Sequence, residues 1–258
     1  MPLSMPDREA PSGGSGALPV PGDDSPYWPF YDLVAAAQVA AWAPTPRRVL
    51  DLSGARTGFA TQLVSAGHEV VHLCRTDSTD IPQAGTGRLL PVRADGATLG
   101  WLADASVDAV LAESSTLSQT VATEVVVAEL RRVLRPEGRL LVVVESLVLG
   151  LARLAEQGRW AELADLPQAD VVLIPTPDGR LTRCFAPEEL RTMLQVAGFS
   201  VDWVRPRTAL TPTVVERALA GGGRSTMATL VATELELEPT GERDGDGLYL
   251  LASARKPA

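Results

Sequence analysis

Cysteine and histidine are scarce in this chain of 258 residues, and their scarcity excludes two kinds of site. The two cysteines, Cys74 and Cys184, are too few for a disulfide framework or for a zinc site built of thiolates. The two histidines, His68 and His72, take part in no metal-ligand spacing. The sequence therefore predicts no metal site and no disulfide scaffold, and we expect both histidines to be structural.

Excess positive charge and long apolar runs are also lacking. Lys and Arg number 23 against 32 Asp and Glu, the net charge is −9 at pH 7, and the arginines are scattered. Such a chain binds polyanions poorly, so nucleic acids and anionic membranes are not expected partners. No apolar run reaches membrane-spanning length, and the first 24 residues lack the basic and apolar regions of a signal peptide. We therefore expect a soluble, cytoplasmic protein of open oligomeric state whose partner is a small molecule.

The composition divides the chain into a tail and one domain. Residues 1–25 are rich in Pro, Gly and Ser and poor in large apolar side chains, which predicts a flexible tail. Residues 26–258 show no internal repeat and no second set of start signals, and they are numerous enough for a sizeable core. We predict a single domain over residues 26–258.

Short apolar runs alternate with helical patterns in the first half of this domain. The runs predict buried strands at residues 48–52, 69–74, 89–95, 107–113 and 139–146. Helical spacing covers residues 58–66 and 120–134, and Pro91 suggests the start or the edge position of its strand. Apolar strands separated by helices are typical of a doubly wound, mostly parallel α/β sheet, which binds ligands at the carboxyl ends of its strands.

The second half of the domain is less regular. A helix is expected at residues 32–42, led by four aromatic residues, and others at 147–163 and 187–198. A hairpin is expected at residues 171–185, and strands at 199–206 and 248–256. The pattern of residues 208–247 favours a helix, but "TLVATELEL" also alternates as a strand does, so this segment stays open.

Three stretches in this order resemble the class I S-adenosylmethionine-dependent methyltransferases. They are "VLDL…GFATQLVSAGHEVV", "VDAVLAESSTLSQTVATEVVVAELRRVLRPEGRLLVVVES" and "FAPEELRTMLQVAGFSVDWV" with the terminal "YLLASARKP". The resemblance covers about residues 30–258. It implies a seven-stranded, Rossmann-like sheet with helices on both faces and S-adenosylmethionine as the cofactor.

The resemblance also implies a cofactor loop after the first strand, and this loop is degenerate. Asp51 keeps the acid that ends the first strand in that family, but Ser53, Ala55 and Thr57 stand at the three glycine positions, and Gly54 is shifted by one. A side chain forced to positive φ costs about 1–2 kcal/mol. "SGARTG" also supplies only the last glycine of a dinucleotide-binding G-x-G-x-x-G in phase, which disfavours an oxidoreductase.

The ribose-binding position is altered as well. The second strand of the family usually ends in a carboxylate for the ribose hydroxyls, and here that position is Cys74. Losing two charge-assisted hydrogen bonds, together with loop strain, weakens binding by about 3–6 kcal/mol. Asp77, three residues further on, compensates if the loop turns back toward the ribose.

The remaining site residues are carried over from the family by position. Asp95 and Gly96 match the adenine-contacting pair, and Glu113 and Ser114 follow the fourth strand, where the methionyl part of the cofactor binds. For a hydroxyl acceptor, the base would be Glu113 or Tyr31. The acceptor pocket is expected in residues 146–186, with Arg159, Trp160 and Arg183 among its lining residues.

The aromatic residues before the first helix admit two hypotheses. Tyr27, Trp28, Phe30 and Tyr31 either form a lid over cofactor and acceptor, as in many small-molecule methyltransferases, or anchor the start of the domain to the sheet. We favour the anchor.

Two functions stay open at this point. The first is methyl transfer to a small-molecule acceptor, with secondary metabolism as one setting. The second is a methyltransferase-like protein that has lost methyl transfer and serves as a pseudoenzyme, a partner-binding protein or an enzyme for another reaction. The altered loop and Cys74 support the second.

Overall fold

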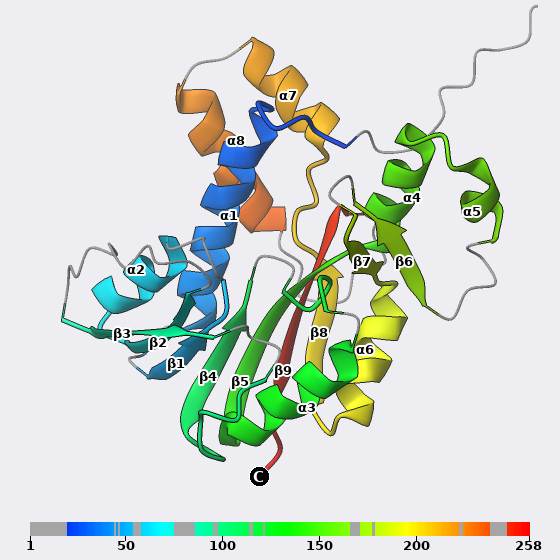
Figure 1. The fold of residues 1–258 in the computed structure, drawn as a ribbon. Helices are drawn as coiled ribbons and strands as arrows, with labels where there is room; N and C mark the ends of the chain where they lie inside the picture. The colour runs from blue at the N-terminus through cyan, green and yellow to red at the C-terminus, as the bar shows by residue number, and fades with distance from the viewer. Residues whose placement is uncertain are drawn as a thin grey trace, which may run out of the picture.

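Seven strands form the main sheet of the computed structural model (Figure 1). The structure describes residues 20–43, 45, 47–53, 58–74, 86–94, 98–113, 116–120, 122–165, 171–176, 179–221, 224–237 and 247–258. The strands of this sheet are β1 Arg48–Asp51, β2 Glu69–Cys74, β3 Arg88–Arg93, β4 Val107–Ala112, β5 Leu134–Glu145, β8 Ser200–Pro206 and β9 Tyr249–Arg255. They lie in the order β3-β2-β1-β4-β5-β9-β8, and only β9 runs antiparallel to its neighbours. This arrangement confirms the predicted fold class, and β3, which contains Pro91, is an edge strand.

Helices cover both faces of the sheet (Figure 1). They are α1 Tyr27–Trp42, α2 Gly58–Ser65, α3 Thr123–Val133, α4 Leu147–Glu156, α5 Trp160–Asp165, α6 Pro187–Val196, α7 Pro212–Ala220 and α8 Arg224–Leu237. α3 and α6 pack on one face of the sheet, and α1 and α2 pack on the other. α7 and α8 lie beside α1, at the top of Figure 1. None of the helices that the structure describes is long and apolar enough to cross a membrane.

Alternate residues of each strand point to opposite faces, so the sheet separates two cores. In β5, Leu140 and Val142 belong to the core beneath α3 and α6. Their neighbours Leu141 and Val143 belong to the core beneath α1 and α2. Strands buried on both faces explain the continuous apolar runs of the sequence.

The helix expected at residues 32–42 begins earlier, at Tyr27. Tyr27 and Phe30 are 1% and 0% exposed and belong to the core around α1 and α2. This burial supports the anchor hypothesis for the aromatic residues.

Two other boundaries differ from the predictions. The helix expected at residues 147–163 is two helices, because Gly158 has a φ of +68° and ends the first one. The strand expected at residues 139–146 begins earlier, at Leu134, and β5 contains an irregularity at its start, where Glu137 has a φ of +62°. In the open segment 208–247, the described residues form α7 and α8, so the helical alternative is confirmed.

The predicted hairpin is a separate two-stranded sheet of β6 Val172–Pro175 and β7 Leu181–Cys184. It packs beside α4, and its end is tied to the main sheet where Phe185 bridges Ser146. The hairpin, α4 and α5 therefore extend the carboxyl end of β5.

Glu145, the last residue of β5, predicts a pH dependence of stability. Burial raises the pKa of its carboxyl above the ordinary value of 4.5, although Arg153 of α4 forms an ion pair with it. Because the folded state holds this proton more tightly than the unfolded chain, the contribution of Glu145 to stability decreases as pH rises from 4.5 through the folded pKa. We expect Glu145→Gln to remove this decrease in urea unfolding curves recorded from pH 4.5 to 8. Glu188→Gln, whose side chain is 81% exposed, should leave the slope unchanged, and an unchanged slope in Glu145→Gln would contradict the assignment.

Candidate functional site

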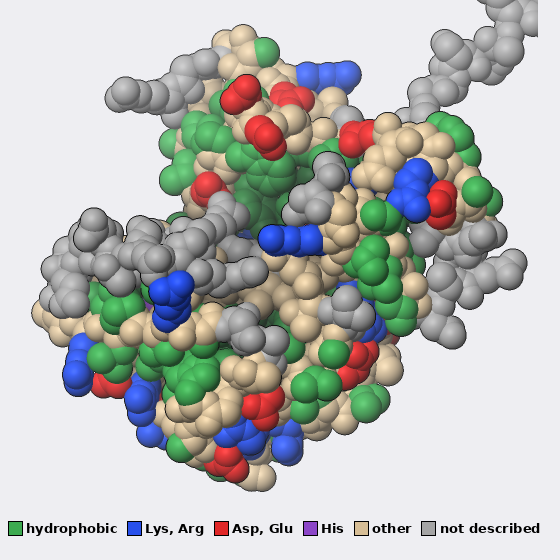
Figure 2. All heavy atoms as spheres, viewed as in Figure 1, with side chains coloured by type: hydrophobic (Ala, Val, Ile, Leu, Met, Phe, Trp, Pro, Cys, Tyr) green, Lys and Arg blue, Asp and Glu red, His purple; other side chains and the backbone are tan. Residues whose placement is uncertain are grey.

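The carboxyl ends of β1, β2 and β4 meet at one edge of the sheet because these strands are parallel. Figure 2 shows the surface hollowed above this edge, between α1, α7 and α8 on one side and α4 on the other, with hydrophobic side chains deep in the hollow. Asp51, Cys74 and Glu113 lie at or directly after the ends of these three strands. The structure therefore brings the described part of the predicted site to one edge.

Asp51 is fully buried, and both of its carboxylate oxygens have partners. Oδ1 accepts a hydrogen bond from the backbone N–H of Ser53 at 2.9 Å, and Oδ2 lies 2.8 Å from Nδ1 of His72. The parallel register places these two side chains together, because Asp51 of β1 pairs with His72 of β2. Asp51 thus orients Ser53, the second residue after β1, while His72 holds Asp51 in place.

Cys74 offers no charge at the ribose position. The thiol is 8% exposed, and its Sγ lies 3.9 Å from the backbone oxygen of His72. Burial and the nearby Asp51 carboxylate raise the pKa of the thiol, so it stays protonated at neutral pH. The side chain therefore behaves as a small apolar residue.

Glu113 and Tyr31, the two predicted bases, meet at a third residue that the sequence analysis did not select. Arg207, which directly follows β8, forms an ion pair with Glu113, and each of the two side chains is 1% exposed. The guanidinium carbon of Arg207 also lies 5.4 Å from the centre of the Tyr31 ring. Burial raises the pKa of the Tyr31 phenol, which makes it a neutral donor rather than a base at physiological pH.

Arg207 has unused hydrogen-bonding capacity. Its Nη2 donates to Glu113, but Nε and Nη1 are buried without a partner among the described residues. The backbone around it is fixed, since Arg207 N donates to the Tyr249 oxygen at 2.8 Å and its oxygen accepts from Gln38 Nε2 at 3.0 Å. A rigidly held cation with spare donors can bind an oxygen atom of a ligand.

The segment after Arg207 is pinned to the helices above the site. Tyr27 and Thr208 share a hydrogen bond of 2.8 Å between their hydroxyl groups. The Glu234 carboxylate of α8 accepts hydrogen bonds from the backbone N–H groups of Ala209 and Leu210 at 2.6 and 2.8 Å. α1 and α8 are thereby tied to the same turn that carries Arg207.

The other predicted cofactor residues cannot be placed, and their assignments stay predictions. The following lie outside the described residues: Gly54, Ala55, Thr57, Asp77, Asp95, Gly96 and Ser114.

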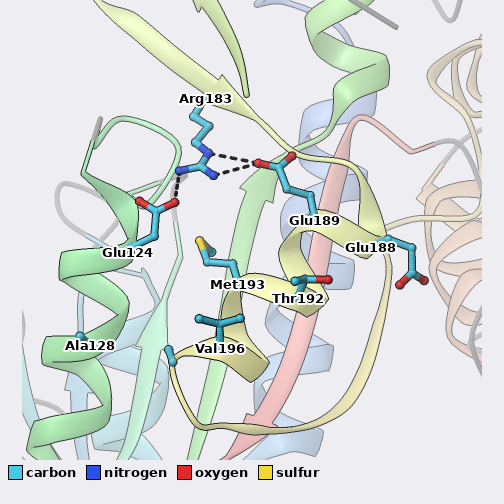
Figure 3. A pocket seen from close by; sticks show the side chains of 9 residues that line it. Glu124, Ala128, Arg183, Glu188, Glu189, Thr192, Met193 and Val196 are labelled. Atoms are coloured by element: carbon cyan, nitrogen blue, oxygen red, sulfur yellow. Dashed lines mark hydrogen bonds and ion pairs between the residues drawn. The ribbon is translucent and has the colours of Figure 1, made fainter. Parts of the chain in front are cut away.

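The three residues predicted to line an acceptor pocket lie in different surroundings. Arg183 is bound between Glu124 of α3 and Glu189 of α6, at 2.7 and 2.9 Å, above a groove of about 580 Å³ between these helices (Figure 3). Arg159 forms an ion pair with Glu162, and Trp160 is 63% exposed. The charge of Arg183 is thus already used within the protein.

Comparison with known proteins agrees with this geometry. Residues 50–142 match the family model of a methyltransferase domain. The 1,6-didemethyltoxoflavin-N1-methyltransferase of Burkholderia thailandensis, solved with its substrate and S-adenosylhomocysteine, is 19% identical with a TM-score of 0.58, over 90% of this chain and 82% of that one. An S-adenosylmethionine-dependent methyltransferase of Mesorhizobium loti is 17% identical with a TM-score of 0.56, over 91% and 99% of the two chains. The [4+2]-cyclase SpnF is 20% identical with a TM-score of 0.53, over 88% and 82%. Among curated proteins, none matches the sequence.

The matched domain and the order of the strands define a class I methyltransferase fold. Residues 50–142 thus match a methyltransferase domain within a fold shared with S-adenosylmethionine-dependent methyltransferases, in agreement with the resemblance seen in the sequence. S-adenosylmethionine is the cofactor that the matched methyltransferase domain implies.

Proposed function

We propose that the protein transfers a methyl group from S-adenosylmethionine to a small-molecule acceptor. The observation that carries the proposal is the group formed by Glu113, Arg207 and Tyr31 at the carboxyl end of β4, in a methyltransferase fold. These three polar side chains are far apart in the sequence and are held together beneath α1 and α8. Packing of the sheet alone would not require a buried polar cluster at this place.

The described residues suit the cofactor at the loop after β1 and suit it poorly at the ribose position. Asp51 would organise the loop that faces the cofactor, because it already fixes the Ser53 amide. At the ribose end, the buried thiol of Cys74 replaces a carboxylate and accepts hydrogen bonds weakly. We therefore expect binding that is weaker by about 3 kcal/mol than with a carboxylate at this position.

Positioning would account for most of the catalysis. The bound cofactor supplies an electrophilic methyl group, so the protein chiefly has to align the acceptor and exclude water. For a hydroxyl acceptor, the Glu113 carboxylate would take the proton while Arg207 holds that carboxylate in place. The neutral Tyr31 phenol would remain a donor throughout, since burial raises its pKa.

The acceptor is proposed to be a small molecule that enters beside residues 146–186. This segment contains α4, α5 and the β6–β7 hairpin, which extend the carboxyl end of β5 next to the hollow of Figure 2. The Burkholderia neighbour, solved with bound 1,6-didemethyltoxoflavin, supports a small-molecule acceptor at this place. Secondary metabolism is a proposed setting, as is a cytoplasmic location.

A second function is favoured by one observation. Cys74 stands where the family usually has a carboxylate that binds the ribose. The [4+2]-cyclase SpnF, which has a similar fold, is named for a reaction other than methyl transfer. The alternative is therefore an enzyme that keeps the hollow and catalyses a reaction other than methyl transfer.

Calorimetric titration with S-adenosylmethionine and with S-adenosylhomocysteine tests the proposal. We expect dissociation constants between about 10 μM and 1 mM for both, because the fold is kept and the ribose contact is weakened. Values above about 1 mM for both ligands would overturn methyl transfer and leave the alternative function.

A further inference from the structure

Another cavity lies where the end of α1 meets β5, β9 and β8. Its volume is about 190 Å³. Among the residues that line it are Gln38, Trp42, Arg139, Leu141, Trp203 and Arg205. Two arginines and two tryptophans face one small space, and none of these described lining residues is acidic.

Each arginine lies over the ring of a tryptophan. The guanidinium carbon of Arg139 lies 5.7 Å from the centre of the Trp42 ring, and that of Arg205 lies 4.2 Å from the centre of the Trp203 ring. A guanidinium over an aromatic ring is attracted to the ring face, and each arginine carries five N–H donors. Arg139 directs one of them to the Trp42 backbone oxygen at 2.9 Å, which fixes the orientation of its group.

Gln38 and Trp42 each contribute a buried polar atom that has no hydrogen-bond partner among the described residues. These atoms are the indole N–H of Trp42, a donor, and Oε1 of Gln38, an acceptor. The orientation of the Gln38 amide is set by its Nε2, which donates to the Arg207 oxygen at 3.0 Å. Both residues are 6% exposed, and a buried polar group without a partner destabilises the folded protein. If these arginines and tryptophans served only to pack against the sheet, the buried polar atoms of Trp42 and Gln38 without partners would have no explanation.

We propose that this cavity binds a small hydroxy-carboxylate. Its carboxylate would accept hydrogen bonds from the indole N–H of Trp42 and from the guanidinium groups, and its hydroxyl would donate to Gln38 Oε1. The volume is below the 300–1,000 Å³ of pockets for drug-sized ligands, which limits the occupant to a few heavy atoms. Leu141, Leu251 and the two indoles give the cavity an apolar wall, which favours an organic anion over phosphate.

The test is a titration of the full-length protein with lactate, propionate and inorganic phosphate, followed by calorimetry and tryptophan fluorescence. Lactate and propionate have similar sizes and differ in the hydroxyl group. We expect lactate to bind at least about 10-fold more tightly than propionate or phosphate. Two variants, Arg205→Gln and Arg139→Gln, change residues that line the cavity. Arg255→Gln is the control, because Arg255 forms an ion pair with Asp202 and does not line the cavity.

Arg205→Gln and Arg139→Gln should each weaken lactate binding at least about 10-fold, whereas Arg255→Gln should not change it. Urea unfolding of each variant separates lost binding from lost folding, and Arg205→Gln keeps the test valid if Arg139→Gln unfolds. Absence of lactate binding, equal binding of lactate and propionate, preference for phosphate, or equal effects of Arg205→Gln and Arg255→Gln would each overturn the proposal.

Discussion

Replacing Arg207 by methionine is expected to lower the free energy of unfolding by about 3–5 kcal/mol, because it leaves the Glu113 carboxylate buried without its cation. Both side chains are 1% exposed, so water cannot replace the lost partner. The substitution also removes the cation above the Tyr31 ring. Urea unfolding at pH 7, monitored by circular dichroism, measures the change.

A double variant separates the ion pair from the packing of the side chain. Glu113→Gln combined with Arg207→Met removes both charges, and most of the lost stability should return. The matched control is Arg217→Met on the exposed side of α7, which should change stability by less than about 0.5 kcal/mol. A double variant that is no more stable than Arg207→Met alone would show that the two charges are not coupled.

The same pair illustrates what the sequence could not reveal. The residues are 94 positions apart, and no local pattern encodes a contact between the end of β4 and the residue after β8. Arg207 stands in the sequence as one of several scattered arginines. What could be predicted was that position 113 follows a buried parallel strand, and therefore that Glu113 lies at the edge where ligands bind.

The contact between Asp51 and His72 could have been predicted from the sequence. Strands β1 and β2 begin at Arg48 and Glu69, which are partners in the parallel register, so residues at equal offsets face each other. Asp51 and His72 share that offset. The periodicity that predicted both strands, combined with a parallel pairing, would have placed these side chains together, although only the structure shows that the carboxylate has no oxygen left over.

The strands and most helices could be predicted because each is buried on a face that its own pattern records. Leu140 to Val143 form a continuous apolar run only because the sheet is covered on both sides. The split of the helix at Gly158 was missed for a different reason. A glycine within an apolar pattern does not reveal the sign of its φ, and only the value of +68° ends the helix there.

Cys74→Asp is expected to tighten S-adenosylmethionine binding about 100-fold, since a carboxylate at the end of β2 would accept two hydrogen bonds from the ribose hydroxyls. The gain is reduced by the buried Asp51, whose charge already raises the pKa of the Cys74 thiol. The new carboxyl would feel the same repulsion, so its effect should be larger at pH 8 than at pH 6. Calorimetric titration at both pH values measures the change.

Cys74→Asn is the matched control, because it has the same shape as the aspartate variant and no charge. It should tighten binding by less than about 10-fold, since neutral hydrogen bonds are worth roughly half as much as charged ones. Equal affinities of the wild type and Cys74→Asp, with folding intact, would mean that the ribose does not lie at the end of β2. In that case the Cys74 thiol would not replace a cofactor contact but would line a site for a different ligand. The alternative function would then be favoured.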